Sequence, residues 1–276
     1  MHNSPLGNTV AYPERYDPTL LVTFQRSENR QKLGINTDLP FCGADIWNAF
    51  ELSWLNSKGM PQVARARFIF PCTTAALIES KSFKLYLNSL NQHVFASLEE
   101  LSNCIHLDLS TAVGAEVEVF LQPFAGMSEV LEVPSGISLD SQDVVCSHYH
   151  PEPSLLKPAI TSDLYEAILD EVLFTDLFRS LCPITGQPDW ATITVCYQGP
   201  QIHHAALLCY LVSYRLHNDF HENCVERIFC DILKECRPHS LSVEANFLRR
   251  GGLDINPVRA TFDSMDYVLF PRYNRQ

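Results

Sequence analysis

Residues 74–91 read TAALIESKSFKLYLNSLN, and residues 205–222 read AALLCYLVSYRLHNDFHE. Laid over one another without gaps, the two stretches share identical residues at Ala75/Ala206, Leu77/Leu208, Ser82/Ser213 and Leu85/Leu216. Downstream of them, VEVFLQ (117–122) resembles VEANFL (243–248). Because the similar stretches follow one another in the same order in both halves, we predict a duplicated α+β module. Each half is expected to contain two strands, helices and two further strands.

Apolar residues at helical spacing predict helices over 161–181 and 218–236, which begin at the polar pairs Thr161-Ser162 and Asn218-Asp219. A third helix is predicted within 43–56. Alternation and β-branched content predict strands at 65–71, 115–124, 191–198, 240–248 and 258–265.

The Pro-rich, polar stretch 150–158 (HPEPSLLKP) is typical of a linker. We therefore predict one module over residues 1–150 and a second over residues 151–276.

The composition is that of an ordinary globular protein, with 276 residues, 46% hydrophobic and 19% charged. A formal net charge of −12 argues against a nucleic-acid-binding surface. The longest apolar run, AALLCYLV (205–212), is too short for a membrane helix, which needs about 20 apolar residues. The first 18 residues have no signal-peptide pattern. We therefore predict a cytoplasmic protein that binds neither nucleic acid nor membranes, and whose ten cysteines are reduced thiols.

One cysteine lies close to two histidines, in the stretch CSHYH. Cys146, His148 and His150 alternate along the chain, and alternate residues of a strand point the same way, so the three could bind zinc. A loop or an interface is the better interpretation of this stretch.

The stretch FRSLCPITGQPDW (178–190) places a cysteine where an amphipathic segment, predicted to be helical, gives way to a Pro-restricted turn. Such a position can present Cys182 to a cleft. Cys196 and Cys209 lie instead in apolar runs, where a small buried hydrophobic residue is expected. The residues alone leave both roles open for Cys182, a core thiol or a nucleophile, and Asp189 could be an ordinary turn aspartate.

The overlay of the two halves is asymmetric in its polar residues. Glu79-Ser80-Lys81 lies opposite Tyr210-Leu211-Val212, whereas Phe220-His221-Glu222 lies opposite Ser89-Leu90-Asn91. The charged groups are divided between the modules, as expected for a composite site that uses pieces of both.

Three motifs together resemble a known family. ESKSFKLY (79–86), LCPITGQPDW (181–190) and FHE (220–222) are similar in type and order to those of the two-module 7-cyano-7-deazaguanine reductases of queuosine biosynthesis. The resemblance covers nearly the whole chain. It implies two tandem tunnelling-fold modules, each an antiparallel sheet with helices packed on one face.

The resemblance also implies a reaction, the reduction of a nitrile to a primary amine with two NADPH. Cys182 would add to the nitrile carbon as a thiolate and form a covalent thioimide. Asp189 would donate a proton to the nitrogen, for which burial would have to raise its pKa. His221 would donate or position a proton in the later step, although a lone histidine before a helix is more often structural.

The substrate is a base with several N–H donors, which ionised carboxylates accept. The resemblance implies substrate-binding by Ile78, Glu79, Ser80, His221 and Glu222. The two glutamates could instead stabilise helix starts.

No GxGxxG motif occurs, so the cofactor site is not expected to be of the Rossmann type. The resemblance implies that Ser80, Lys81, Arg250 and Gly251 bind NADPH. A solvated surface turn is the alternative for Arg249-Arg250-Gly251-Gly252.

Modules of this kind join edge to edge, which predicts a homodimer or a higher homo-oligomer. Two other functions stay open: a zinc-dependent cyclohydrolase-like enzyme of the same superfamily that uses CSHYH, and a base-binding module without catalysis.

Overall fold

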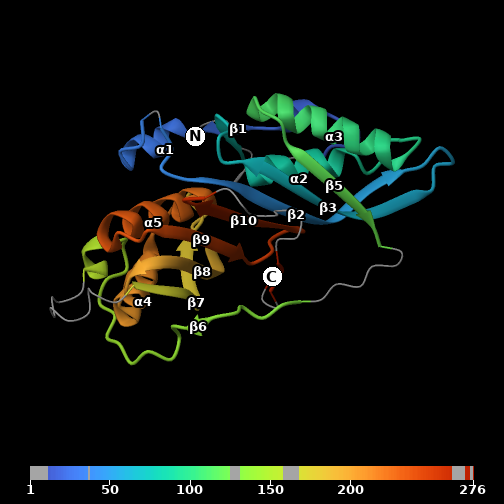
Figure 1. The fold of residues 1–276 in the computed structure, drawn as a ribbon. Coiled ribbons are helices and arrows are strands. Elements are labelled where there is room, and N and C mark those ends of the chain that lie inside the picture. The colour runs from blue at the N-terminus through green and yellow to red at the C-terminus, as the bar shows by residue number, and fades with distance from the viewer. Residues whose placement is uncertain (1–11, 37, 125–130, 158–167, 263–270, 274–275) are drawn as a thin grey trace. The chain divides into compact units, whose positions relative to one another are not determined.

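A computed structural model describes residues 12–36, 38–124, 131–157, 168–262, 271–273 and 276. The chain divides into two compact units, and Figure 1 labels most of their helices and strands. Unit 1 comprises the residues up to Lys32, Asp45–Val130 and Arg249–Asp254. Unit 2 comprises Leu33–Ala44, Leu131–Leu248 and Ile255–Gln276. Each unit thus contains a short stretch from the other half of the chain, and the boundary at residue 150 stays a prediction.

Unit 1 is built on antiparallel strands. Its elements are η1 Pro18–Leu20, β1 Thr23–Gln25, α1 Ser27–Lys32, β2 Cys42–Leu55 from Asp45 onward, β3 Pro61–Pro71, β4 Ala76–Ile78, α2 Ser80–Ser89, α3 Leu98–Val113 and β5 Glu118–Pro123. The strands β5, β3 and β2 are neighbours in that order, while β1 pairs antiparallel with β4. The Phe83 ring of α2 packs edge-on against Phe68 of β3 and Trp47 of β2, which fixes α2 on this sheet.

Unit 2 likewise has two long strands followed by two helices and a further strand. It contains β6 Ile137–Ser138, η2 Pro153–Leu156, β7 Ile168–Leu181, β8 Pro188–Pro200, α4 His204–Val212, η3 Ser213–Leu216, α5 His221–Cys236, β9 Ser240–Phe247 and β10 Leu253–Ala260 from Ile255 onward. Its strands follow the order β10-β9-β8-β7-β6, all antiparallel except β6, which runs parallel to β7. Helices and mainly antiparallel sheets in both units confirm the predicted α+β class.

Helix α5 confirms the helix predicted over 218–236. Its buried apolar residues Val225, Ile228, Phe229 and Ile232 recur at helical spacing, so that one face packs against the core. The predicted strands at 65–71, 115–124, 191–198 and 240–248 lie on β3, β5, β8 and β9 and are confirmed. The strand predicted at 258–265 starts too late, because β10 runs from Leu253 to Ala260; residues 263–265 lie outside the described residues.

The helix predicted over 161–181 is wrong wherever that range is described, since residues 168–181 form β7. Residues 161–167, with the proposed caps, lie outside the described residues. Thr175 faces Ile193 and Phe178 faces Ala191 on β8, so β7 carries one extra residue, a β-bulge. The buried side chains of β7 are therefore Leu173, Thr175, Phe178 and Ser180, and this uneven spacing resembles a helical period in the sequence.

The helix predicted within 43–56 is also wrong, because these residues lie on β2 apart from the final Asn56. Residues 44–50 of β2 are all buried. A strand buried on both faces has no alternation of apolar and polar residues, and such a run cannot be told from a buried helix by periodicity.

The duplication is present in the structure, but the predicted overlay is out of register by seven residues. In unit 1 the Tyr86 hydroxyl of α2 donates to Asp108 of α3 at 2.6 Å, and in unit 2 Tyr210 of α4 donates to Asp231 of α5 at 2.7 Å. The hydroxyl of the serine three residues after each tyrosine donates to the tyrosine carbonyl at 2.6 Å in both units. Tyr86 therefore corresponds to Tyr210 rather than to His217, and Glu79 corresponds to His203.

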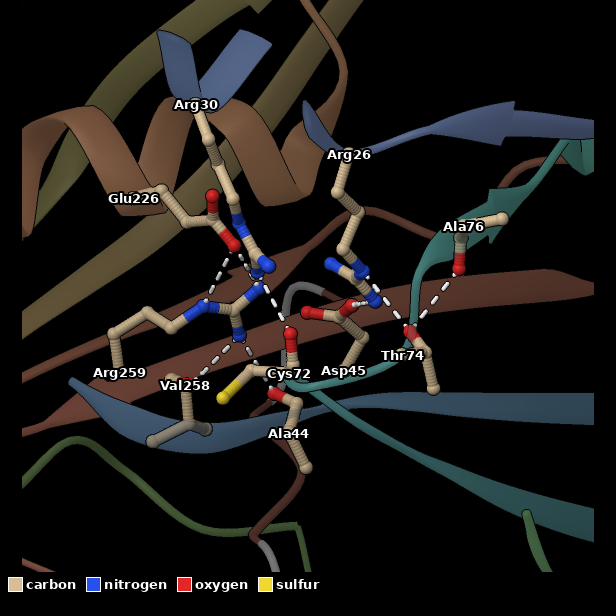
Figure 2. A network of polar contacts seen from close by, with 10 residues as sticks. All are labelled: Arg26, Arg30, Ala44, Asp45, Cys72, Thr74, Ala76, Glu226, Val258 and Arg259. Atoms are coloured by element: carbon tan, nitrogen blue, oxygen red, sulfur yellow. Dashed lines mark hydrogen bonds and ion pairs between the residues drawn. The ribbon is translucent and has the colours of Figure 1, made fainter. Parts of the chain in front are cut away.

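Each unit also contains a buried ion pair, drawn in Figure 2. In unit 1, Arg26 pairs with Asp45 and donates to the Thr74 hydroxyl. In unit 2, the Arg259 guanidinium donates to Glu226 Oε1 through Nε at 3.2 Å and Nη2 at 2.9 Å. Both residues of this second pair are at most 1% exposed.

Burial in the sheet of unit 2 raises the pKa of Glu244 on β9 to about 7. The folded protein therefore favours the protonated carboxyl, and the cost of ionising it grows as the pH rises from about 4.5 to about 7. We expect Glu244→Gln to leave the free energy of unfolding unchanged near pH 5 and to raise it by about 1–3 kcal/mol at pH 8. Urea unfolding at both pH values measures this, with the exposed Asp143→Asn as control. An equal effect of Glu244→Gln at both pH values would contradict it.

Candidate active site

Cys182 lies in the hairpin between β7 and β8, not at the end of a helix as the sequence predicts. Its backbone N–H donates to the Gln187 carbonyl at 2.8 Å, and its carbonyl accepts from the Gly186 N–H at 2.9 Å. Gly186 has a φ of 66°, a left-handed conformation that glycine adopts without strain. These bonds fix the backbone of Cys182, which is 7% exposed.

Asp189 follows on the opposite arm of the same hairpin. It is the second residue of β8, faces Ser180 of β7 and is 4% exposed. Its Oδ2 lies 3.7 Å from Nε2 of His221. The structure therefore brings together two of the predicted catalytic residues and places Cys182 in the turn of the strand pair that carries Asp189.

His221 and Glu222 form the first turn of α5. The imidazole ring of His221 packs edge-on against the Phe247 ring of β9, with 4.1 Å between the ring centroids, which orients it. Glu222 is 3% exposed. A helix start attracts negative charge through the N-terminal end of the helix dipole, and an ionised carboxylate accepts hydrogen bonds, as a base with N–H donors requires.

The other nine cysteines differ among themselves in exposure. Cys72 and Cys224 are buried, while seven are partly exposed, including Cys196 and Cys209, for which the prediction of a buried residue is wrong. Burial raises the pKa of the thiols of Cys104, Cys196, Cys209, Cys224, Cys230 and Cys236. These six are held in the thiol form, which is a poor nucleophile. All ten cysteines are described and none is in a disulfide, while the reduced state of the thiols stays a prediction.

The CSHYH stretch is a loop, as the preferred interpretation predicts. His148 and His150 are exposed, and Cys146 Sγ lies 4.0 Å from Cys209 Sγ of α4. Within the described ranges, no group of three or more His, Cys, Asp or Glu side chains is arranged to hold a metal ion.

In unit 1, Glu79 caps α2 with both of its carboxylate oxygens. Oε1 accepts from the Lys81 N–H and Oε2 from the Ser82 N–H, both at 2.7 Å. Glu79 is 1% exposed, and Ile78 before it is buried at the end of β4. The alternative of a glutamate that stabilises a helix start is thus confirmed for Glu79. Each carboxylate oxygen has a second lone pair, so the cap leaves capacity to accept from a ligand.

The predicted cofactor residues of unit 1 are a serine and a lysine at the start of α2 and an arginine and a glycine from the turn after β9. Ser80 and Lys81 open α2, and the Lys84 side chain approaches Gly251 closely, since a Cβ added there would lie 3.3 Å from Lys84 Cε. Lys84 is a further positive group that none of the sequence motifs indicated as cofactor-binding. Helical spacing could have found it, because residues 80, 81 and 84 share one face of a helix.

Arg249, next to Arg250, stacks on Phe50 with its guanidinium carbon 4.6 Å from the ring centroid, and Arg65 does the same at 4.7 Å. Because Glu79 occupies the backbone N–H groups of Lys81 and Ser82, phosphate groups at this place would be bound by lysine and arginine side chains. The residues present fit a cofactor that carries phosphate.

Among the described helices, none is long and apolar enough to cross a membrane.

Two family models match the chain. The model described as "Nitrile reductase, 7-cyano-7-deazaguanine-reductase N-term" matches residues 12–121, and that described as "QueF-like protein" matches residues 188–265. A solved structure, the crystal structure of the archaeosine synthase QueF-Like in the apo form, aligns with 34% of this chain and 91% of its own, at 18% identity and a TM-score of 0.30.

Curated relatives extend the match over almost the entire chain. The NADPH-dependent 7-cyano-7-deazaguanine reductases of Paraburkholderia phymatum and Paraburkholderia xenovorans are both 49% identical over 94% of this chain and 94% of their own. The counterpart from Bordetella avium is 48% identical over the same shares. The resemblance that the motifs indicated is thereby confirmed, and the chain belongs to the 7-cyano-7-deazaguanine reductase family.

Proposed function

We propose that the protein reduces the nitrile of 7-cyano-7-deazaguanine to the aminomethyl group, consuming two NADPH, as a step of queuosine biosynthesis. Membership of a family whose curated relatives carry this name supports the reaction. The observation that carries the assignment of residues is the hairpin of β7 and β8: a buried cysteine in its turn, a buried aspartate on its arm, and His221 3.7 Å from that aspartate.

In the proposed first step, Cys182 Sγ adds as a thiolate to the nitrile carbon. One π bond of the nitrile breaks, and the nitrogen takes a proton from the Asp189 carboxyl, which gives a thioimide. A carboxyl that holds a proton near neutral pH must be shielded from water. The Asp189 side chain meets this requirement, because the residue is 4% exposed.

The cofactor supplies the two hydrides that a nitrile needs to become an amine. After the first hydride has reached the carbon, the carbon–sulfur bond breaks, and Cys182 leaves as a thiolate from the resulting imine. His221 positions or donates a proton to the imine nitrogen while the carbon accepts the second hydride. Overall, one nitrile, two NADPH and two protons give one primary amine and two NADP⁺.

We further propose that Glu79 and Glu222 accept N–H donors of the base, aided by Ile78, Ser80 and His221. Lys81, Arg250 and Gly251, with Ser80 and Lys84, are proposed to bind the phosphates of NADPH. Lysine and arginine supply the charge that phosphate requires. The protein is proposed to form a homodimer or a higher homo-oligomer.

A test of the reaction separates binding from chemistry. Mixed with the nitrile alone, the protein should gain the mass of the intact nitrile on Cys182, as read by intact mass and peptide mapping. Addition of NADPH should then oxidise two NADPH for each amine formed. Turnover without any adduct would contradict the thioimide, and neither adduct nor NADPH oxidation would contradict the function and favour a base-binding module.

The glutamates are tested by their effect on substrate binding. A hydrogen bond to a charged group contributes about 1.5–3 kcal/mol, so Glu222→Gln should raise the KM for the nitrile about 10- to 100-fold with a smaller effect on kcat. Glu99→Gln is the matched control, since Glu99 occupies the same place in the first turn of α3 and is exposed. An unchanged KM in Glu222→Gln would remove Glu222 from the substrate site.

A further inference from the structure

The three residues before the FHE motif pair with the strand that leads to Cys182. The Leu181 N–H donates to the His217 carbonyl at 2.8 Å, and the Asp219 N–H donates to the Leu181 carbonyl at 3.1 Å. Leu181 and Asn218 accordingly form a parallel bridge. Both backbone polar groups of the residue before Cys182 are thus held by the segment that leads into α5.

The side chain of Asp219 is bound to the first turn of α5. Its Oδ1 accepts from the Phe220 N–H at 2.8 Å and from the Asn223 amide at 2.7 Å. Its Oδ2 lies 3.5 Å from His217 Nε2. Phe220, at the N-cap position of α5, makes no capping hydrogen bond with its side chain, so Asp219 supplies the polar group that this helix start lacks.

The groups around Asp219 also determine the charge of its carboxyl group. Burial acts to raise the pKa of Asp219, but the contact with His217 and the bonds from Asn223 and the Phe220 N–H lower it below its usual value. The aspartate is therefore ionised at neutral pH. A charged acceptor makes stronger hydrogen bonds than a neutral one, which stiffens the junction between β7 and α5.

We propose that Asp219 is a positioning residue that sets the place of Cys182 relative to His221 and Glu222. Its backbone binds the residue before the cysteine, and its side chain binds the helix turn that carries the histidine and the glutamate. Asp219 needs no contact with the substrate for this role. The inference rests on the proposed function, because it assigns Cys182 and His221 to one reaction.

The geometry predicts how loss of this link affects the reaction. In Asp219→Ala the backbone hydrogen bond from the N–H of residue 219 to the Leu181 carbonyl persists. The Phe220 N–H and the Asn223 amide lose the carboxylate that accepts from them, so the first turn of α5 can shift. A displacement of about 1 Å can cost on the order of 100-fold in rate, so kcat should fall about 10- to 100-fold. Because the proposed base-binding residue Glu222 lies on the same turn, the Kd for the nitrile should rise as well, and the loss in kcat is therefore measured at saturating nitrile. Asp219→Asn keeps an acceptor oxygen and should retain activity within about 3-fold of wild type.

A matched control distinguishes positioning from simple stabilisation. Ser97 caps α3, the helix of unit 1 that corresponds to α5, by accepting from the Glu100 N–H at 3.1 Å. Ser97→Ala and Asp219→Ala should both lower Tm by a few degrees. Only Asp219→Ala should slow adduct formation with the nitrile. The rate is measured in single turnover without NADPH, at a temperature well below the unfolding transitions of both variants.

A second readout is independent of turnover. Peptide-level alkylation by iodoacetamide reports the environment of each thiol, and Asp219→Ala should change the rate at Cys182 about 3-fold or more, with the rate at Cys72 in unit 1 unchanged. If Asp219→Ala does not fold, Asn223→Ala removes one bond to the same oxygen and should show the same pattern at smaller amplitude.

The two proposals fail differently. Wild type that neither forms an adduct nor oxidises NADPH overturns the proposed function, while a changed Cys182 alkylation rate in Asp219→Ala still supports the structural link. Wild type that is active, with Asp219→Ala equal to Ser97→Ala in turnover and in alkylation, overturns the positioning role of Asp219.

Discussion

Replacing Cys182 by alanine is expected to abolish nitrile reduction. Removal of a covalent nucleophile typically costs on the order of 10⁴- to 10⁶-fold in kcat, because the remaining groups stabilise only steps that no longer occur. Cys182→Ala should also form no adduct with the nitrile. Steady-state NADPH oxidation and intact mass measure the two effects.

The same variant should still bind the base. The proposed hydrogen bonds to the nitrile substrate come from glutamates, so the Kd measured by calorimetry should stay within about 10-fold of wild type. Cys196→Ala is the matched control. Burial raises the pKa of the Cys196 thiol to about 11, so it is no nucleophile at neutral pH, and its loss should leave kcat within about 3-fold. Cys182→Ala with more than a tenth of wild-type activity would contradict the assignment.

Replacing Arg259 by methionine is expected to have the largest effect on stability. The guanidinium is fully buried and donates to Glu226 Oε1 and to the carbonyls of Ala44, at 3.2 Å, and Val258, at 2.8 Å. Removing one partner of a buried ion pair leaves the other charge in a medium that solvates it poorly. The free energy of unfolding should fall by about 3–5 kcal/mol, measured by urea unfolding.

A double-mutant cycle checks the cause. With Glu226→Gln present, Arg259→Met should cost about 1–3 kcal/mol less, because no buried carboxylate then loses the guanidinium. The ion pair of Lys157 and Glu235, 3.2 Å apart, provides a control in the same unit because the Lys157 side chain is 65% exposed, and Lys157→Met should change stability by less than about 1 kcal/mol. Additive effects of Arg259→Met and Glu226→Gln would contradict the ion pair as the cause.

The candidate site shows where sequence reasoning reaches its limit. Its motifs identify Cys182 and Asp189 as a pair because they lie seven residues apart across a Gly-Gln-Pro turn. The contact of Asp189 with His221, and the link through Asp219 to Leu181, join residues distant along the chain, and no local pattern encodes them. The capping bonds of Glu79 likewise depend on where α2 begins.

The sequence by itself determined the family, the α+β class, the helix over 221–236 and four of the strands, because apolar periodicity and turn residues are local properties of the chain. Tertiary structure alone decided that residues 168–181 and 42–55 are strands. In β7 a bulge makes the buried positions uneven, and in β2 burial on both faces removes the alternation. Pairing with neighbouring strands then determines the conformation, and it also sets the true register of the duplication, which the tyrosine–aspartate bonds of the two units reveal.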